Sequence, residues 1–112
     1  MKILVCVKHV MEPESKIRIN QSGKWVEHSD STRFEMNPFD TYAVEEALLI
    51  KQRFEDSVIH AITIGPDHAR YTLRRTLGMG ADEGIHIVDK TEGFRSSFLT
   101  ASWIASYAGT MD

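Results

Sequence analysis

A short apolar run without polar alternation, Ile3 to Val7, constrains the fold of this chain more than any other feature. A strand with one solvated face would alternate polar and apolar residues, so a continuous run indicates a strand covered on both faces, as in a parallel sheet. Two further β-rich runs follow, at residues 57–64 and 84–88. We therefore expect a sheet of buried, mainly parallel strands.

Helical patterns separate these runs. The segment Asn37-Pro38-Phe39-Asp40 predicts a helix start, because Asn can cap free N–H groups, Pro fits the first helical position and Asp suits the positive first turn. Apolar residues then recur at three- and four-residue steps up to residue 54, and similar patterns follow at about 69–77 and 95–107. Strands alternating with helices predict a doubly wound α/β fold with helices on both faces of the sheet.

An insertion follows the first strand. Residues 16–19 alternate polar and apolar side chains, residues 20–23 are turn formers, and residues 24–27 return to a strand-like pattern. This order predicts an exposed β-hairpin.

The length of the sequence allows one domain or a piece of one, since it has 112 residues, of which 42% are hydrophobic. In doubly wound sheets the first strand is commonly interior, and a strand after the third helix would cover its free side. The sequence stops after that helix, so the edge beside Ile3 to Val7 would be apolar and open to association. We expect residues 1–112 to form a single, incomplete nucleotide-binding α/β domain, truncated or completed by another chain.

Composition excludes several classes of protein. Thirteen Lys and Arg against sixteen Asp and Glu give a net charge of −3 with scattered charges, which argues against a nucleic-acid surface. One cysteine excludes an internal disulfide and a cysteine-based zinc site, and suits a reducing compartment. The first apolar run is too short for a signal peptide or membrane span, so we expect a cytoplasmic protein without membrane insertion.

Searches for catalytic motifs predict no catalytic residue and no metal site. The glycines of residues 78–84 precede a strand and are better interpreted as a helix end than as a dinucleotide loop. No Walker loop, nucleophile elbow or His-Glu-x-x-His occurs, and the five histidines are dispersed. We favour core packing over nucleophilic chemistry for Cys6, and a solvated face over a phosphate site for the arginines at 70, 74 and 75.

One positional signal for ligand binding remains. Cys6, the Asn37 cap and the segment Ile64-Gly65-Pro66 are all expected at the carboxyl edge of the sheet. Parallel sheets bind ligands at this edge, where helix N-termini favour anions, so a nucleotide would fit there.

Three segments resemble the amino-terminal half of the electron transfer flavoprotein β-subunit: KILVCVKH at residues 2–9, MNPFD with AVEEA at residues 36–47, and TLGMGAD with GIH at residues 76–86. The resemblance covers nearly all of the chain in order, and Asn-Pro-Phe is its most diagnostic element. It implies a Rossmann-like domain of the adenine-nucleotide alpha-hydrolase type. It also implies an electron carrier, not an enzyme, that forms a heterodimer with an α-subunit and serves flavin dehydrogenases, in the cytoplasm or the mitochondrial matrix.

The resemblance further implies cofactors and a site. FAD would lie mostly on the α-subunit, while the β-subunit holds AMP, or a second FAD in bifurcating members. The implied nucleotide contacts are Cys6, Asn37, Pro38, Phe39, Asp40, Ile64 and Gly65. Asn37 would supply polar contacts and Cys6 and Ile64 small or apolar walls, although Asn37 as a cap and Phe39 as packing are also expected without a ligand. The family continues with a fourth strand and a second phosphate loop, so we expect weak or no nucleotide binding by residues 1–112 alone.

Two other classes stay open on the residues alone. A small universal-stress-like ATP-binding protein would need a glycine-rich phosphate loop late in the chain, and none is seen. An adenosine-type hydrolase or ligase domain would need a phosphate motif near the first strand, which residues 8–11 do not supply.

Overall fold

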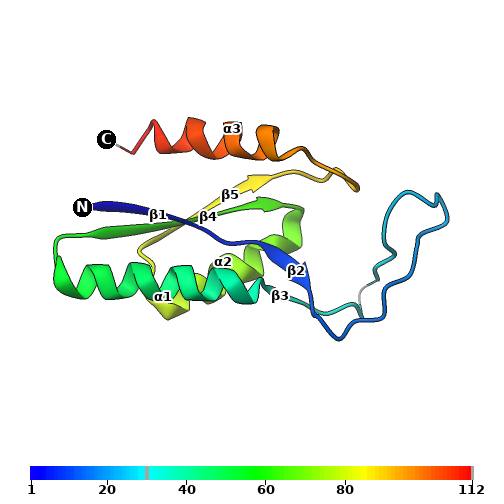
Figure 1. Ribbon diagram of the computed structural model, residues 1–112, viewed down its shortest axis with the longest axis horizontal. Coiled ribbons are helices and arrows are strands. Elements are labelled where there is room, and N and C mark those ends of the chain that lie inside the picture. Colours follow the sequence, from blue (N-terminus) through cyan, green and yellow to red (C-terminus); the bar gives the residue numbers. More distant parts are fainter. Residues whose placement is uncertain (30, 112) are drawn as a thin grey trace.

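The computed structural model describes residues 1–29 and 31–111. In chain order the elements are β1 (Lys2–Cys6), β2 (His9–Met11), β3 (Phe34–Met36), α1 (Pro38–Arg53), β4 (Val58–Gly65), the 3₁₀ turn η1 (Asp67–Ala69), α2 (Arg70–Met79), β5 (Glu83–Val88) and α3 (Ser97–Ala108). Helices α1 and α2 cover one face of the sheet and α3 lies over the other (Figure 1). The doubly wound α/β fold predicted from the sequence is confirmed.

The main sheet has the strand order β1-β4-β5, and both pairings are parallel. Cys6 is opposite Ile62, and Gly65 is opposite Val88, so the carboxyl ends of the three strands meet at one edge. Strand β4 is central. The outer edge of β1 carries no other strand within residues 1–29 and 31–111, as the sequence led us to expect.

The hydrophobic core lies between the sheet and the helices α1 and α2. Ile59 and Ala61 of β4 pack with Val44 of α1 and Leu73 of α2, all buried. Helix α3 contributes no buried residue. The two faces of the sheet are therefore unequally covered, and the looser face is the one beneath α3.

The start of α1 is fastened to the segment that follows β1. Asn37 Oδ1 accepts a hydrogen bond from the Phe39 N–H at 2.9 Å, which confirms Asn37 as the helix cap, with Pro38 at the first helical position. The Asn37 N–H donates to the Lys8 carbonyl at 2.8 Å, and Asp40 Oδ2 accepts from the Lys8 N–H at 2.8 Å. These bonds hold the first turn of α1 at the carboxyl end of β1.

The insertion after β1 forms antiparallel pairing around a turn at the predicted place, but without regular strands. It contains one isolated antiparallel bridge, between Ile19 and Val26, in place of two regular strands. The regular pairing lies outside it, where β2 and β3 form a two-stranded antiparallel sheet that the sequence did not indicate. Tertiary contacts with η1 and α2, described below, stabilise that small sheet, whereas most residues of the bridge region are exposed.

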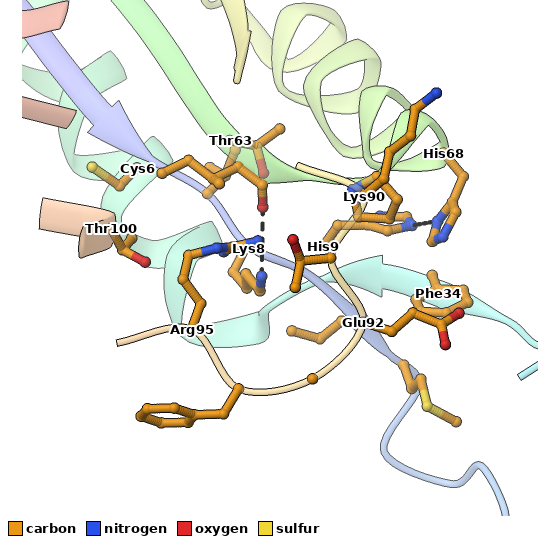
Figure 2. A pocket seen from close by; sticks show the side chains of 18 of the residues that line it. Cys6, Lys8, His9, Phe34, Thr63, His68, Lys90, Glu92, Arg95 and Thr100 are labelled. Carbon is orange, nitrogen blue, oxygen red and sulfur yellow. Dashed lines mark hydrogen bonds between the residues drawn. The ribbon is translucent and has the colours of Figure 1, made fainter. Parts of the chain in front are cut away.

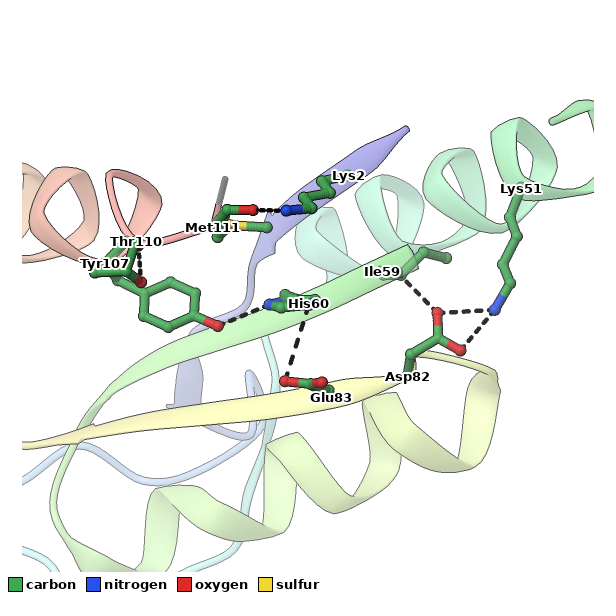
Figure 3. Close-up of polar contacts among 9 residues, drawn as sticks. All are labelled: Lys2, Lys51, Ile59, His60, Asp82, Glu83, Tyr107, Thr110 and Met111. Atoms are coloured by element: carbon green, nitrogen blue, oxygen red, sulfur yellow. Dashed lines mark hydrogen bonds and ion pairs between the residues drawn. The ribbon is translucent and has the colours of Figure 1, made fainter. Parts of the chain in front are cut away.

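A carboxylate joins α1, β4 and the start of β5 at the opposite edge of the sheet. Asp82 accepts two hydrogen bonds from Lys51 Nζ, at 2.6 and 2.8 Å, and one from the Ile59 N–H at 2.8 Å (Figure 3). The backbone bond and the Lys51 bond lower the pKa of Asp82. The ionised carboxylate therefore connects α1, β4 and the start of β5 through charge-assisted hydrogen bonds.

We expect Asp82→Asn to lower the free energy of unfolding by about 1 kcal/mol, because the charge-assisted bonds weaken while the shape is kept. Urea unfolding at neutral pH measures the change. Glu55→Gln is the matched control, since Glu55 is exposed and makes no ion pair among the described residues. Equal stability of the two variants would contradict a stabilising role of the Asp82 hydrogen bonds.

Helix α3 is fastened to the sheet by a few polar contacts. Tyr107 Oη lies 2.7 Å from His60 Nδ1, and Lys2 Nζ donates to the Met111 carbonyl (Figure 3).

Within the part of the chain that the structure describes, no helix has both the length and the apolar character needed to cross a bilayer.

Candidate functional site

A cavity of about 920 Å³ opens between α3, the carboxyl ends of β1 and β4, and the small β2–β3 sheet (Figure 2). Its volume lies within the range of small-molecule sites, roughly 300 to 1,000 Å³. Ile62 and Ile64 of β4 and Ile104 of α3 supply apolar walls. The loose covering of the sheet by α3 leaves room for this cavity.

Two cationic side chains, Lys8 and Arg95, line one part of this cavity (Figure 2). The Lys8 ammonium donates a long hydrogen bond of 3.5 Å to the Ile64 carbonyl. Burial and the nearby Arg95 guanidinium lower the pKa of Lys8, which Asp89 partly offsets. The cavity therefore places two positive charges close enough to interact.

Arg95 is held in place by the loop between β5 and α3. Its Nε donates to Asp89 Oδ2 at 2.7 Å, and its guanidinium carbon lies 5.6 Å from the centre of the Trp103 ring. Asp89 also accepts from the Thr91 N–H at 3.0 Å, and the bonds from Thr91 and then Arg95 lower the pKa of Asp89 to about 2. Both charged side chains are mostly buried, at 16% and 13% exposed, so the orientation of Arg95 is fixed.

A group of imidazole and phenyl rings lines another part of the cavity (Figure 2). We call His9, His68 and Thr72, together with Phe34, the histidine cluster. His9 Nε2 lies 3.0 Å from His68 Nδ1, His9 Nδ1 lies 2.7 Å from the Thr72 hydroxyl, and the His9 ring stacks on Phe34 at 4.9 Å. These contacts join the β2–β3 sheet to η1 and α2.

The histidine cluster favours neutral rings. Burial is the main cause that lowers the pKa of His9 to about 4, and His68, Lys8 and His86 add to it. Burial and His28 lower the pKa of His68, against a smaller opposite effect of Asp67. Within residues 1–29 and 31–111, no group of three or more His, Cys, Asp or Glu side chains is arranged to hold a metal ion.

One buried hydroxyl at the cavity has no partner. Thr63 lines the cavity, and its Oγ1 is buried without a hydrogen bond to any described residue. The hydroxyl is covered by the protein, so a ligand in the cavity would not contact it in this conformation.

The structure brings together only some of the site residues expected from the sequence. Cys6, Asp40 and Ile64 line the cavity. The other four expected residues are neighbours of lining residues in the sequence but do not line the cavity themselves: Asn37, Pro38, Phe39 and Gly65. The first turn of α1 thus reaches the cavity through Asp40, not through its cap.

Two side-chain interpretations are corrected. Cys6 is exposed and borders the cavity, so the expectation of core packing is wrong; the residue sits at the end of an edge strand whose α3 side is open. Partial burial of the thiol, and then the negative charge of Asp40, raise the pKa of Cys6, which disfavours a thiolate. Phe39 is 80% exposed, so its expected packing role is also wrong.

The sequence did not reveal Lys8, Arg95 or the histidine cluster as parts of one site. Lys8 and Arg95 come from distant segments, and His9 and His68 lie in β2 and η1, so no local spacing signals their contact. The arginines at 70, 74 and 75 are exposed, and two of them lie over the Tyr71 ring at 5.4 and 5.5 Å, in agreement with a solvated face.

The fold and the cavity define a parallel α/β domain with a ligand-sized site at the carboxyl edge of its sheet. Residues 24–108 match the model of the electron transfer flavoprotein domain, and the chain belongs to the electron transfer flavoprotein family. Its similarity to β-subunits of that family, expected from the three sequence segments, is confirmed.

Several relatives carry the name electron transfer flavoprotein subunit beta. The chain is 43% identical over 93 residues to that of Bradyrhizobium diazoefficiens, covering 83% of this chain and 36% of the relative. It is 45% identical over 87 residues to the mitochondrial subunit of Arabidopsis thaliana and 38% identical over 87 residues to the human subunit, covering 78% of this chain and 34% of each relative. The chain thus spans about a third of the length of these relatives.

Proposed function

We propose that residues 1–112 form part of the β-subunit of an electron transfer flavoprotein, and that the cavity binds the adenine nucleotide of that subunit. The observation that carries the proposal is the position of the cavity, at the carboxyl ends of β1 and β4 beside the first turn of α1. Ligands of open α/β sheets bind at this edge.

The residues around the cavity fit an adenine nucleotide. Ile62, Ile64 and Ile104 offer apolar surface to a planar base. Lys8 and Arg95 offer positive charge to phosphate. AMP satisfies both features, and the AMP part of a second FAD would satisfy them in the same way.

In this function the chain binds and positions the nucleotide and catalyses no reaction of its own. The redox-active FAD would be held mainly by an α-subunit, which would accept electrons from flavin dehydrogenases and pass them on. The α-subunit and those dehydrogenases are the partners we propose. The cytoplasm, or the mitochondrial matrix of a eukaryote, is the compartment we propose for the heterodimer.

We expect the natural protein that contains residues 1–112 to copurify with AMP or a flavin and with a second subunit. Mass spectrometry of the released nucleotide and of the copurified chains measures this directly. ATP without a partner would instead support the universal-stress-like alternative, which also has a nucleotide at this edge of an α/β sheet.

We expect residues 1–112 alone to bind AMP, ADP and FAD weakly or not at all, because the cavity is open and the relatives continue well beyond this segment. Calorimetric titration of the 112-residue chain measures the affinity. A submicromolar dissociation constant would contradict the expectation that further residues complete the site.

A further inference from the structure

We propose that the outer face of α2 docks an acidic surface of an electron-transfer partner protein. This face, which we call the arginine face, is formed by Arg70, Tyr71, Arg74, Arg75 and Gly78, all of them exposed. None of these residues lines the cavity, so the arginine face is separate from the proposed nucleotide site. That the partner is a redox protein rests on the proposed function, whereas its acidic character follows from the face itself.

The guanidinium groups of the arginine face have no carboxylate partner. Within residues 1–29 and 31–111, no ion pair joins Arg70, Arg74 or Arg75 to an acidic side chain. Helix α2 itself contains no Asp or Glu. The whole chain has a net charge of −3, so this positive patch is a local feature of one helix.

The positions of these charges do not stabilise the helix. Arg70 lies in the first turn, where the helix dipole disfavours a cation, and Arg74 lies four residues later, where like charges repel. The guanidinium carbons of both residues lie over one ring, at 5.4 and 5.5 Å from the centre of Tyr71. The ring orients the two cations but also brings them together. A negatively charged partner would relieve this repulsion, so the arrangement favours one.

Gly78 is a second, independent indication that another molecule approaches this face. It lies inside α2 without a positive φ, and a Cβ at its position would meet no atom within 4 Å. Glycine destabilises a helix relative to alanine, so neither the helix nor its packing explains this residue. A backbone without a side chain does allow close approach. Gly78 follows Arg74 by one turn, so that approach would occur beside the charges.

The composition of the arginine face favours a protein over a nucleic acid. Tyr and Arg are enriched at the centres of protein–protein contacts. Asp67 precedes α2, and Asp82 and Glu83 follow it, so carboxylates at both ends of the helix would repel a continuous polyanion. The face is charged and small against the roughly 20 to 30 residues a side of a stable interface. These properties fit the transient encounters of electron-transfer proteins.

The test measures how a purified flavin dehydrogenase of the same organism reduces the natural, flavin-containing protein that includes this chain. The variant is Arg74→Glu, and Lys24→Glu on the exposed insertion is the matched control, since it changes the net charge equally. At about 0.02 M salt we expect Arg74→Glu to raise the KM of the dehydrogenase for the flavoprotein by about tenfold, with kcat unchanged. At about 0.3 M salt the difference should shrink to about twofold or less. Lys24→Glu should change the KM by less than about twofold at both salt concentrations.

Gly78→Gln separates contact from charge, because it adds bulk to the face without a charge. We expect it to raise the KM by about fivefold at both salt concentrations. Neither variant should melt at a lower temperature than the wild type. Gln is the better helix former, and Arg74→Glu turns a repulsive pair with Arg70 into an attractive one.

Equal KM values for Arg74→Glu and Lys24→Glu at low salt, or an unchanged KM for Gly78→Gln, would overturn the arginine face as a docking site and leave the proposed function standing. Loss of heparin binding in Arg74→Glu with an unchanged KM would assign the face to a polyanion and would overturn the proposal as well. A wild type that no flavin dehydrogenase of the organism reduces would overturn the proposed function, and with it the partner.

Discussion

Replacement of Ile59 by Ala is expected to lower the free energy of unfolding by about 3 to 4 kcal/mol. Ile59 is fully buried in β4, the central strand, where it packs in one cluster with Val44 and Ala47 of α1 and Leu73 of α2. Its truncation removes apolar contacts with both helices and leaves a cavity that the strand, paired on both sides, cannot close. Urea unfolding at neutral pH, followed by circular dichroism, measures the loss.

Two further variants sharpen this test. Ile59→Val should cost only about 1 kcal/mol, because one methyl group is removed and the β-branched shape stays. Ile17→Ala removes the same atoms from a side chain that is 72% exposed, and should change stability by less than about 0.5 kcal/mol. If Ile59→Ala and Ile17→Ala were equally stable, the packing of β4 against α1 and α2 would not be the main core of this domain.

The sequence predicted the order of strands and helices well, because each main element has a local signal. The Asn37-Pro38 start of α1 depends on neighbours in the chain, and its capping bond is formed as expected. Strand β4 is buried on both faces, as an unalternating apolar run predicts. Strand β1 has the same pattern but only Val5 is fully buried, because its outer edge and its α3 side are open.

The insertion shows where local patterns stop being informative. Alternation over residues 16–27 is a true hairpin signal, yet the pairing there is limited to the Ile19–Val26 bridge and two backbone hydrogen bonds, from the Asn20 N–H to the Trp25 carbonyl and from the Glu27 N–H to the Arg18 carbonyl. The strands that do pair, β2 and β3, are three residues each and lie far apart in the chain. Their stability comes from the contacts of His9 and Phe34 with η1 and α2, which no short window of sequence contains.

The candidate site was predictable in position but not in composition. The carboxyl edge of the sheet follows from the α/β order, and Cys6, Asp40 and Ile64, which were expected in the site, line the cavity there. Arg95 is oriented by its ion pair with Asp89, which also accepts a hydrogen bond from the Thr91 N–H in the loop before α3. The sequence does not distinguish this part-buried ion pair from the other charged residues.

Acidification from pH 6.5 to about 4 is expected to lower the free energy of unfolding through the histidine cluster. The pKa of His9 falls from 6.5 in the unfolded chain to about 4 in the folded protein, so folding favours the neutral ring. The stabilising contribution is therefore complete above pH 6.5 and is lost as the pH falls toward 4. His68, whose pKa is lowered too, adds to the same loss.

The cluster would lose its geometry as it gains protons. Two protonated rings cannot share the 3.0 Å hydrogen bond between His9 and His68, and Lys8, His28 and His86 add positive charge around them, which Asp67 only partly offsets. One shifted proton costs about 1.4 kcal/mol per pH unit, and since His9 is partly solvated we expect a loss of about 2 kcal/mol in total. Urea unfolding at several pH values across this window measures the loss.

His9→Gln separates the cluster from general acid unfolding, because Gln can donate and accept hydrogen bonds but does not titrate in this window. The variant should be less stable than the wild type at neutral pH and should lose at most half as much stability on acidification to about pH 4. The lowered pKa values of Asp82 and Asp89 also make stability fall as the pH approaches 4, but both carboxylates are present in the variant and the wild type, so their contribution cancels in the comparison. Identical acid profiles of His9→Gln and the wild type would show that the contacts of the β2–β3 sheet with η1 and α2 tolerate protonated imidazoles, and that the cluster is no pH-dependent part of the fold.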